Sequence, residues 1–186
     1  VDNNAAFVLN KGQIKEVDIA TDAVYIKSSK GIYAYQVCGL WNTNGNEMGS
    51  ALLPSISCTG SKRVSFTRHL NKRYFVQIMA QRKTLGQFAM YNASNVEQLT
   101  FSAYINDFNN WKKVVPSDKG IADDVWYTIM IPMSSSPFSI STGTYSIANT
   151  TGLFHLSALD ENGGSMSYGY FSSYSSVKIE GPSQTC

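Results

Sequence analysis

Charged residues are scarce in this sequence, and the scarcity limits its range of partners. Asp, Glu, Lys and Arg make up 15% of the 186 residues, well below the roughly 25% of average soluble chains. The formal net charge is only +2, so composition gives no reason to expect binding to nucleic acid. Ser, Thr, Asn and Tyr supply the polar side chains instead, which is typical of extracellular β-proteins.

Long apolar runs are missing as well. No stretch approaches the ~18 residues that a transmembrane helix needs, so we expect no membrane insertion. The chain opens with Val1-Asp2-Asn3-Asn4 and shows no secretory signal. Either the chain has been processed or it is a fragment of a much larger protein; we favour the fragment and expect residues 1–186 to form a single domain.

Histidine is almost absent, which bears on metal and catalytic chemistry. The two histidines, His69 and His155, fall in different predicted hairpins, with no Cys or carboxylate at the spacing of a zinc site. His155 lies inside a predicted strand, where a structural role is favoured. No G-x-S-x-G elbow occurs either. We therefore expect no enzyme and no catalytic residues.

A glycoside hydrolase is kept as the lowest alternative. Such an enzyme needs two carboxyl groups about 5–9.5 Å apart in one cleft. The candidates are Asp107, Asp118, Asp123 and Asp124.

Only three cysteines are present. Cys38 and Cys58 close a modest loop and lie beside Gly39 and Gly60, so a disulfide between them is predicted for an oxidising compartment. Two buried free thiols are the alternative. Cys186 is the last residue and is expected not to pair with either of them.

What the chain does contain is a series of short segments with strand patterns. Residues 32–40 are dense in β-branched and aromatic side chains, which predicts a strand covered on both faces in the middle of a sheet. We expect residues 23–27 to form a hairpin with it, and 63–68 to form another with 73–81. Further strands are expected at 14–19, 125–131 and 144–148, and a hairpin over 153–171.

No long amphipathic helix appears in the sequence. The even spacing of short strands and turns therefore predicts an all-β fold, with little or no helix. We expect an antiparallel β-sandwich of the jelly-roll or immunoglobulin-like type.

Three aromatic side chains in or beside loops are candidate ligand-binding residues: Trp41, Tyr91 and Trp111. Exposed rings of this kind stack on sugars in carbohydrate-binding modules. Aromatic side chains also close the ends of sandwich cores. Both interpretations stay open.

Two further features suggest charged ligands. Asp160 and Asn162, in the predicted hairpin turn, are candidate ligands for Ca²⁺, although a tight turn favours the same residues without a metal. Seven Lys and Arg occur between Lys62 and Lys83 without any Asp or Glu, which suits a polyanion. A solvated face balanced by acids elsewhere is the commoner explanation of such a run.

Several blocks of the sequence resemble the IgGFc-binding-protein N-terminal domain family. The blocks are YAYQV at 33–37, ALLPSISCTGS at 51–61 and VSFTR at 64–68, while FHL at 154–156 and YGYFS at 168–172 resemble the family's last hairpin. Two positions depart from the family pattern: Gly31 stands where Pro is expected, and Cys38 falls directly before Gly39.

The resemblance implies a role outside the cell. Bacterial members of this family lie in large secreted surface proteins and adhesins of gliding-type bacteria. We therefore expect a non-catalytic adhesion module on the cell surface, joined to neighbouring domains of the same chain. Its expected partner is a protein or a glycan, with carbohydrate binding as the alternative function. No binding residues are carried over from the family.

Overall fold

The computed structural model describes residues 6–19, 24–38, 49–56, 59–114, 125–136, 138–162 and 165–170. These ranges contain mainly β-strands, which confirms the predicted all-β class. The strands are β1 (Ala34–Cys38), β2 (Gly49–Leu53), β3 (Arg63–Arg68), β4 (Tyr74–Gln81), β5 (Phe88–Asn92), β6 (Lys112–Lys113), β7 (Trp126–Pro132), β8 (Gly143–Asn149), β9 (Phe154–Asn162) and β10 (Ser165–Tyr170). The helical elements are α1 (Leu99–Asn106) and the short 3₁₀ turns η1 (Arg82–Thr84) and η2 (Phe108–Asn110).

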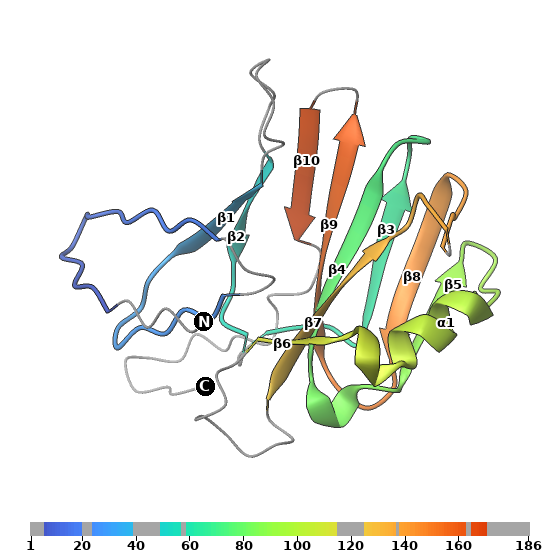
Figure 1. The fold of residues 1–186 in the computed structure, drawn as a ribbon, viewed down its shortest axis with the longest axis horizontal. Coiled ribbons are helices and arrows are strands. Elements are labelled where there is room, and N and C mark those ends of the chain that lie inside the picture. Colours follow the sequence, from blue (N-terminus) through green and yellow to red (C-terminus); the bar gives the residue numbers. More distant parts are fainter. Residues whose placement is uncertain are drawn as a thin grey trace.

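Two antiparallel sheets carry the core (Figure 1). The larger has the strand order β10-β9-β4-β7-β6, and the smaller has the order β3-β8-β5. Alternate side chains of a strand point to opposite faces, so β4 buries Tyr74, Val76, Ile78 and Ala80 on one face. These side chains and the buried ones of the smaller sheet belong to one hydrophobic core.

The helix α1 covers one end of this core beside β5 (Figure 1). Its side chains Phe101 and Ile105 are buried. The Asn106 amide accepts a hydrogen bond from the backbone N–H of Phe88 and donates one to the Phe88 carbonyl, both at 2.9 Å. Because β5 lies at the edge of its sheet, this side chain supplies the backbone partners that a further strand would otherwise give.

The prediction of a central, doubly covered strand at residues 32–40 is wrong. Among the described strands β1 pairs with β2 alone, in a two-stranded sheet that lies beside β10 (Figure 1). Tyr35 and Val37 are 65% and 56% exposed. Residues 24–27 form no strand, so the predicted hairpin with them is wrong too, and neither do residues 14–19. Apolar density marks a strand former, but it does not determine how many faces other elements cover.

The predicted hairpin of 63–68 with 73–81 has the right strands and the wrong partners. β3 pairs with β8, while β4 pairs with β7 and β9 in the other sheet. The chain therefore crosses from one sheet to the other between β3 and β4, and the buried Arg68 stabilises this connection. Its guanidinium donates to the Ile140 carbonyl, and also to the Asn71 side chain and the Lys72 carbonyl at 3.0 Å each. Arg68 is thereby removed from the predicted basic surface, since it is only 2% exposed.

The remaining strand predictions are confirmed. β7 and β8 occupy the segments predicted at 125–131 and 144–148. β9 and β10 form the predicted final hairpin, in which Asn162 pairs with Ser165. Across the described part of the chain, no helix has both the length and the apolar character needed to span a membrane.

Candidate ligand-binding site

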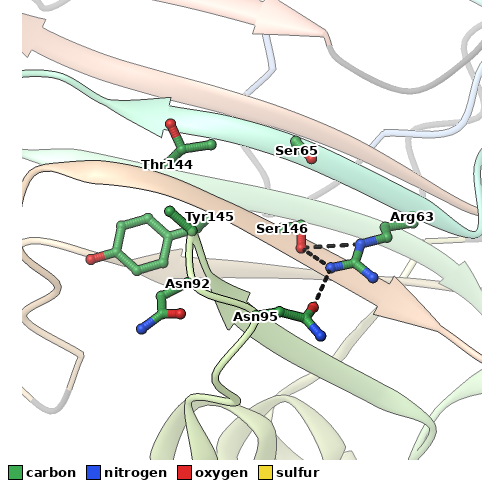
Figure 2. A pocket seen from close by; sticks show the side chains of 8 residues that line it. Arg63, Ser65, Asn92, Asn95, Thr144, Tyr145 and Ser146 are labelled. Carbon is green, nitrogen blue, oxygen red and sulfur yellow. Dashed lines mark hydrogen bonds between the residues drawn. The ribbon is translucent and has the colours of Figure 1, made fainter.

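An open pocket of about 190 Å³ lies on the outer face of the smaller sheet (Figure 2). We call it the Arg63 pocket. Most of its lining residues are polar, and its members are Arg63, Ser65, Asn92, Ala93, Asn95, Thr144, Tyr145 and Ser146. They come from β3, from β8, from the last residue of β5 and from the turn that follows it.

The strand pleat and the strand register build the floor of the pocket. Along β3 exposed and buried positions alternate, which places Arg63 and Ser65 on the outer face and Val64 in the core. Ser65 pairs with Ser146 of β8, and Ser146 pairs in turn with Tyr91 of β5. Serine, serine and tyrosine thus form one row across three strands.

The wall of the pocket is the turn after β5. The Asn92 side chain accepts hydrogen bonds from the backbone N–H groups of Ser94 and Val96, at 3.0 and 2.9 Å. Asn95 adopts a positive φ of 58°, a conformation that Asn tolerates better than most residues. This turn presents the Asn95 side chain to the guanidinium of Arg63 (Figure 2).

Arg63 is held from three sides. Its Nε and Nη2 donate to the Ser146 hydroxyl at 3.2 and 2.8 Å, and Nη2 also donates to the Asn95 carbonyl oxygen at 3.0 Å. The guanidinium carbon lies 5.1 Å from the centre of the Tyr91 ring, within the range of a cation–π interaction. A flexible side chain is therefore fixed in one position, so less conformational entropy is lost when a ligand contacts it.

The structure changes the role of the predicted aromatic candidates. Tyr91 is half-buried and carries the Arg63 guanidinium over its ring, so a sugar does not reach the face that Arg63 occupies. The prediction of Trp111 as an exposed ligand-binding residue is wrong. Trp111 is only 5% exposed, the centre of its ring lies 5.7 Å from that of Phe88, and its Nε1–H donates to the Ile105 carbonyl at 2.7 Å. Trp111 closes the core, which was its alternative interpretation. Trp41 lies outside the described residues.

Asp160 and Asn162 are not in a turn as predicted, because β9 extends through Asn162. Asp160 is buried, and its Oδ2 lies 3.2 Å from Nδ1 of His69. Burial raises the pKa of Asp160, while His69 and Arg68 act in the opposite direction. Basic neighbours disfavour a cation at this carboxylate. The Asn162 side chain lies outside the described part of the structure.

Two further residues named from the sequence, His155 and Asp107, make structural hydrogen bonds. His155 is 2% exposed, with Nε2 3.1 Å from the Ile56 carbonyl, which confirms its structural role. Burial lowers the pKa of His155. Asp107 caps η2 by accepting from the Asn109 backbone N–H. Within these same ranges no three His, Cys, Asp or Glu side chains gather as a metal site.

Several predictions fall outside the described residues. They are the disulfide between Cys38 and Cys58, for which the Cys38 side chain and all of Cys58 are missing from the description, the unpaired Cys186, and the carboxylates Asp118, Asp123 and Asp124. The disulfide and the hydrolase alternative stay predictions.

Comparison with protein-family models, with curated proteins and with solved structures finds no match to this chain. The resemblance to the IgGFc-binding family therefore stays a prediction based on the sequence blocks. The candidate site rests on the geometry of the Arg63 pocket.

Proposed function

We propose that this protein is a non-catalytic binding and adhesion module of an extracellular bacterial surface protein, and that it binds a glycan at the Arg63 pocket. One observation carries the proposal. Arg63 is fixed by Ser146, Asn95 and the Tyr91 ring on the solvent side of a sheet, and its exposed side chain is not part of the hydrophobic core of the described residues. A long side chain that is already ordered before a ligand binds is typical of a preorganised binding surface.

The chemistry of the lining supports a glycan as the ligand. The amide of Asn92 and the hydroxyls of Ser65 and Thr144 offer hydrogen-bond donors and acceptors to sugar hydroxyl groups. None of the described residues that line the pocket carries a carboxylate. Binding without hydrolysis is therefore the function that these side chains support, because glycoside hydrolysis uses a pair of acidic residues.

The extracellular assignment rests on the sequence. The low charge and the abundance of Ser, Thr, Asn and Tyr suit a secreted β-module, and the blocks that resemble the IgGFc-binding family suit a surface adhesin. A parent gene that encodes a long multidomain product with a secretion signal would support the assignment. A short reading frame without such a signal would contradict it.

A glycan array tests the proposed site. We expect the wild-type protein to bind a subset of glycans, and Arg63→Ala to lose that binding because the anchor of the pocket is gone. Lys113→Ala, which removes an exposed cation from β6 on the other sheet, is the matched control and should bind as the wild type does. No glycan binding by the wild type, or binding untouched by Arg63→Ala, would contradict the proposal.

A further inference from the structure

We infer that the glycan is acidic, and that Nη1 of Arg63 binds its anionic oxygen. The inference rests on the proposed function and adds the class of ligand to it. Two features of the Arg63 side chain support it, its hydrogen bonds and its charge.

The guanidinium has five N–H donors. Three hydrogen bonds use Nε–H and the two N–H groups of Nη2, with Ser146 and Asn95 as acceptors. Both N–H groups of Nη1 are left without a protein acceptor among the described residues. Figure 2 shows the remaining guanidinium nitrogen directed away from Ser146 and Asn95.

The positive charge of Arg63 also has no ion-pair partner among the described residues. A guanidinium stays protonated at every physiological pH, and both of its hydrogen-bond acceptors are neutral. The ion pair found within the described residues joins His69 to Asp160, and Arg63 takes no part in it. A fixed guanidinium with free N–H groups and no ion-pair partner among the described residues is suited to a carboxylate or sulfate oxygen.

The surroundings give the pocket a single fixed cation. Of the seven basic residues between Lys62 and Lys83, Arg68 is buried. Arg82 lies 5.5 Å from the Phe108 ring centre, near the helical end of the molecule. Glu97 pairs with Tyr91 on the edge of β5 away from Ser146, which adds a negative charge beside the pocket. The site therefore offers one fixed cation, not a continuous basic stripe.

Matched polymers test this inference. The carboxylate arm compares polygalacturonate with its fully methyl-esterified form, and the sulfate arm compares dextran sulfate with dextran. We expect the wild-type protein to bind at least one acidic polymer about tenfold more tightly than its neutral counterpart, since one charge-assisted hydrogen bond is at stake. The arm that shows this preference identifies the anionic group.

Two variants connect the preference to Arg63. Arg63→Gln should remove it, and Asn95→Asp should weaken it by about tenfold because the new carboxylate neutralises the guanidinium while the turn is retained. Lys113→Gln removes the same charge from β6 and should keep affinity within about twofold, because solvent and salt screen a separate surface charge. Circular dichroism of each variant checks that the fold is intact.

The outcomes separate this inference from the proposed function. If the array shows glycan binding but neither acidic polymer is preferred, the ligand is neutral and the inference is overturned while the proposed function stands. A preference that survives both Arg63→Gln and Asn95→Asp overturns the inference as well. If the wild type binds no glycan at all, both fail.

Discussion

At the scale of residues, two arginines of β3 have opposite roles because of where the pleat points them. Arg68 faces inward, where backbone carbonyls and the Asn71 side chain satisfy most of its donors, and it holds the crossing between the two sheets. Arg63 faces outward and presents its charge to solvent. An odd separation along a strand places two side chains on opposite faces, so one guanidinium stabilises the fold and the other is available to a ligand.

His155 makes the stability of the protein depend on pH. Burial lowers its pKa in the folded protein, so below the ordinary value of about 6.5 the unfolded chain binds a proton that the folded chain does not. We expect the free energy of unfolding to fall as pH drops from 7 to 5, by up to about 1.4 kcal/mol per pH unit for this one group. Urea titrations at several pH values measure the slope.

The variant His155→Gln isolates this effect. Glutamine keeps a donor for the Ile56 carbonyl but does not titrate, so its unfolding free energy should vary less between pH 7 and 5 than that of the wild type. The raised pKa of Asp160 acts in the opposite direction, since its contribution to stability is lost as pH rises through the folded-state pKa. Asp160 is present in both proteins, so its effect cancels in the comparison. Equal slopes for the two proteins would contradict the assignment.

At the scale of elements, the connection between β8 and β9 packs tightly against η1. The buried Asn149 side chain donates to the Thr84 carbonyl at 2.8 Å and accepts from the Gly152 backbone N–H at 3.0 Å. A Cβ atom added at Gly152 would lie 2.2 Å from Cγ2 of Thr84. The close approach therefore requires glycine at this position.

This contact gives a prediction that a double-mutant cycle measures. Gly152→Ala should lower the free energy of unfolding by about 1–3 kcal/mol, the usual cost of overpacking. Adding Thr84→Ser removes the clashing methyl group and should restore part of that loss. Gly31→Ala, at a glycine with open space around it, should change stability by less than about 0.5 kcal/mol. Additive effects of the first two changes would rule out the clash.

Alternation along single segments was enough to predict most of the strands. The spacing of Val64 and Phe66 predicts β3, and the acidic Asn-Gly turn predicts the β9–β10 hairpin. The pairing of the strands is harder to predict, because a period of two in the sequence identifies the two faces of a strand but not the strand beside it. β1 shows a further limit, since its apolar side chains are exposed in a two-stranded sheet.

Most of the candidate site could not be predicted from the sequence, for the same reason. Arg63 was visible as a member of a basic run, but its partner Ser146 is 83 positions away and meets it only through the β3–β8 register. The sequence predicts an exposed aromatic ring at Tyr91, whereas in the structure the Arg63 guanidinium lies over that ring. The Asn-rich turn at 92–95 was the local signal that sequence reasoning missed, since Asn is one of the few residues that accept a positive φ.

At the scale of the whole molecule, the five-stranded and the three-stranded sheets have different roles. The five-stranded sheet contributes more buried side chains to the shared core than the three-stranded sheet does, and the outer face of the three-stranded sheet holds the Arg63 pocket. A glycan on that face would contact strands whose inner side chains are already packed, so binding requires little rearrangement.

The most direct test of this account is an NMR titration of the ¹⁵N-labelled protein with the glycan that binds most tightly on the array. We predict that amide shift changes concentrate on residues 63–67, 91–97 and 144–146, which surround the Arg63 pocket. Changes centred on β1 and β2, where Tyr35 and Val37 are exposed, with none around Arg63, would contradict it.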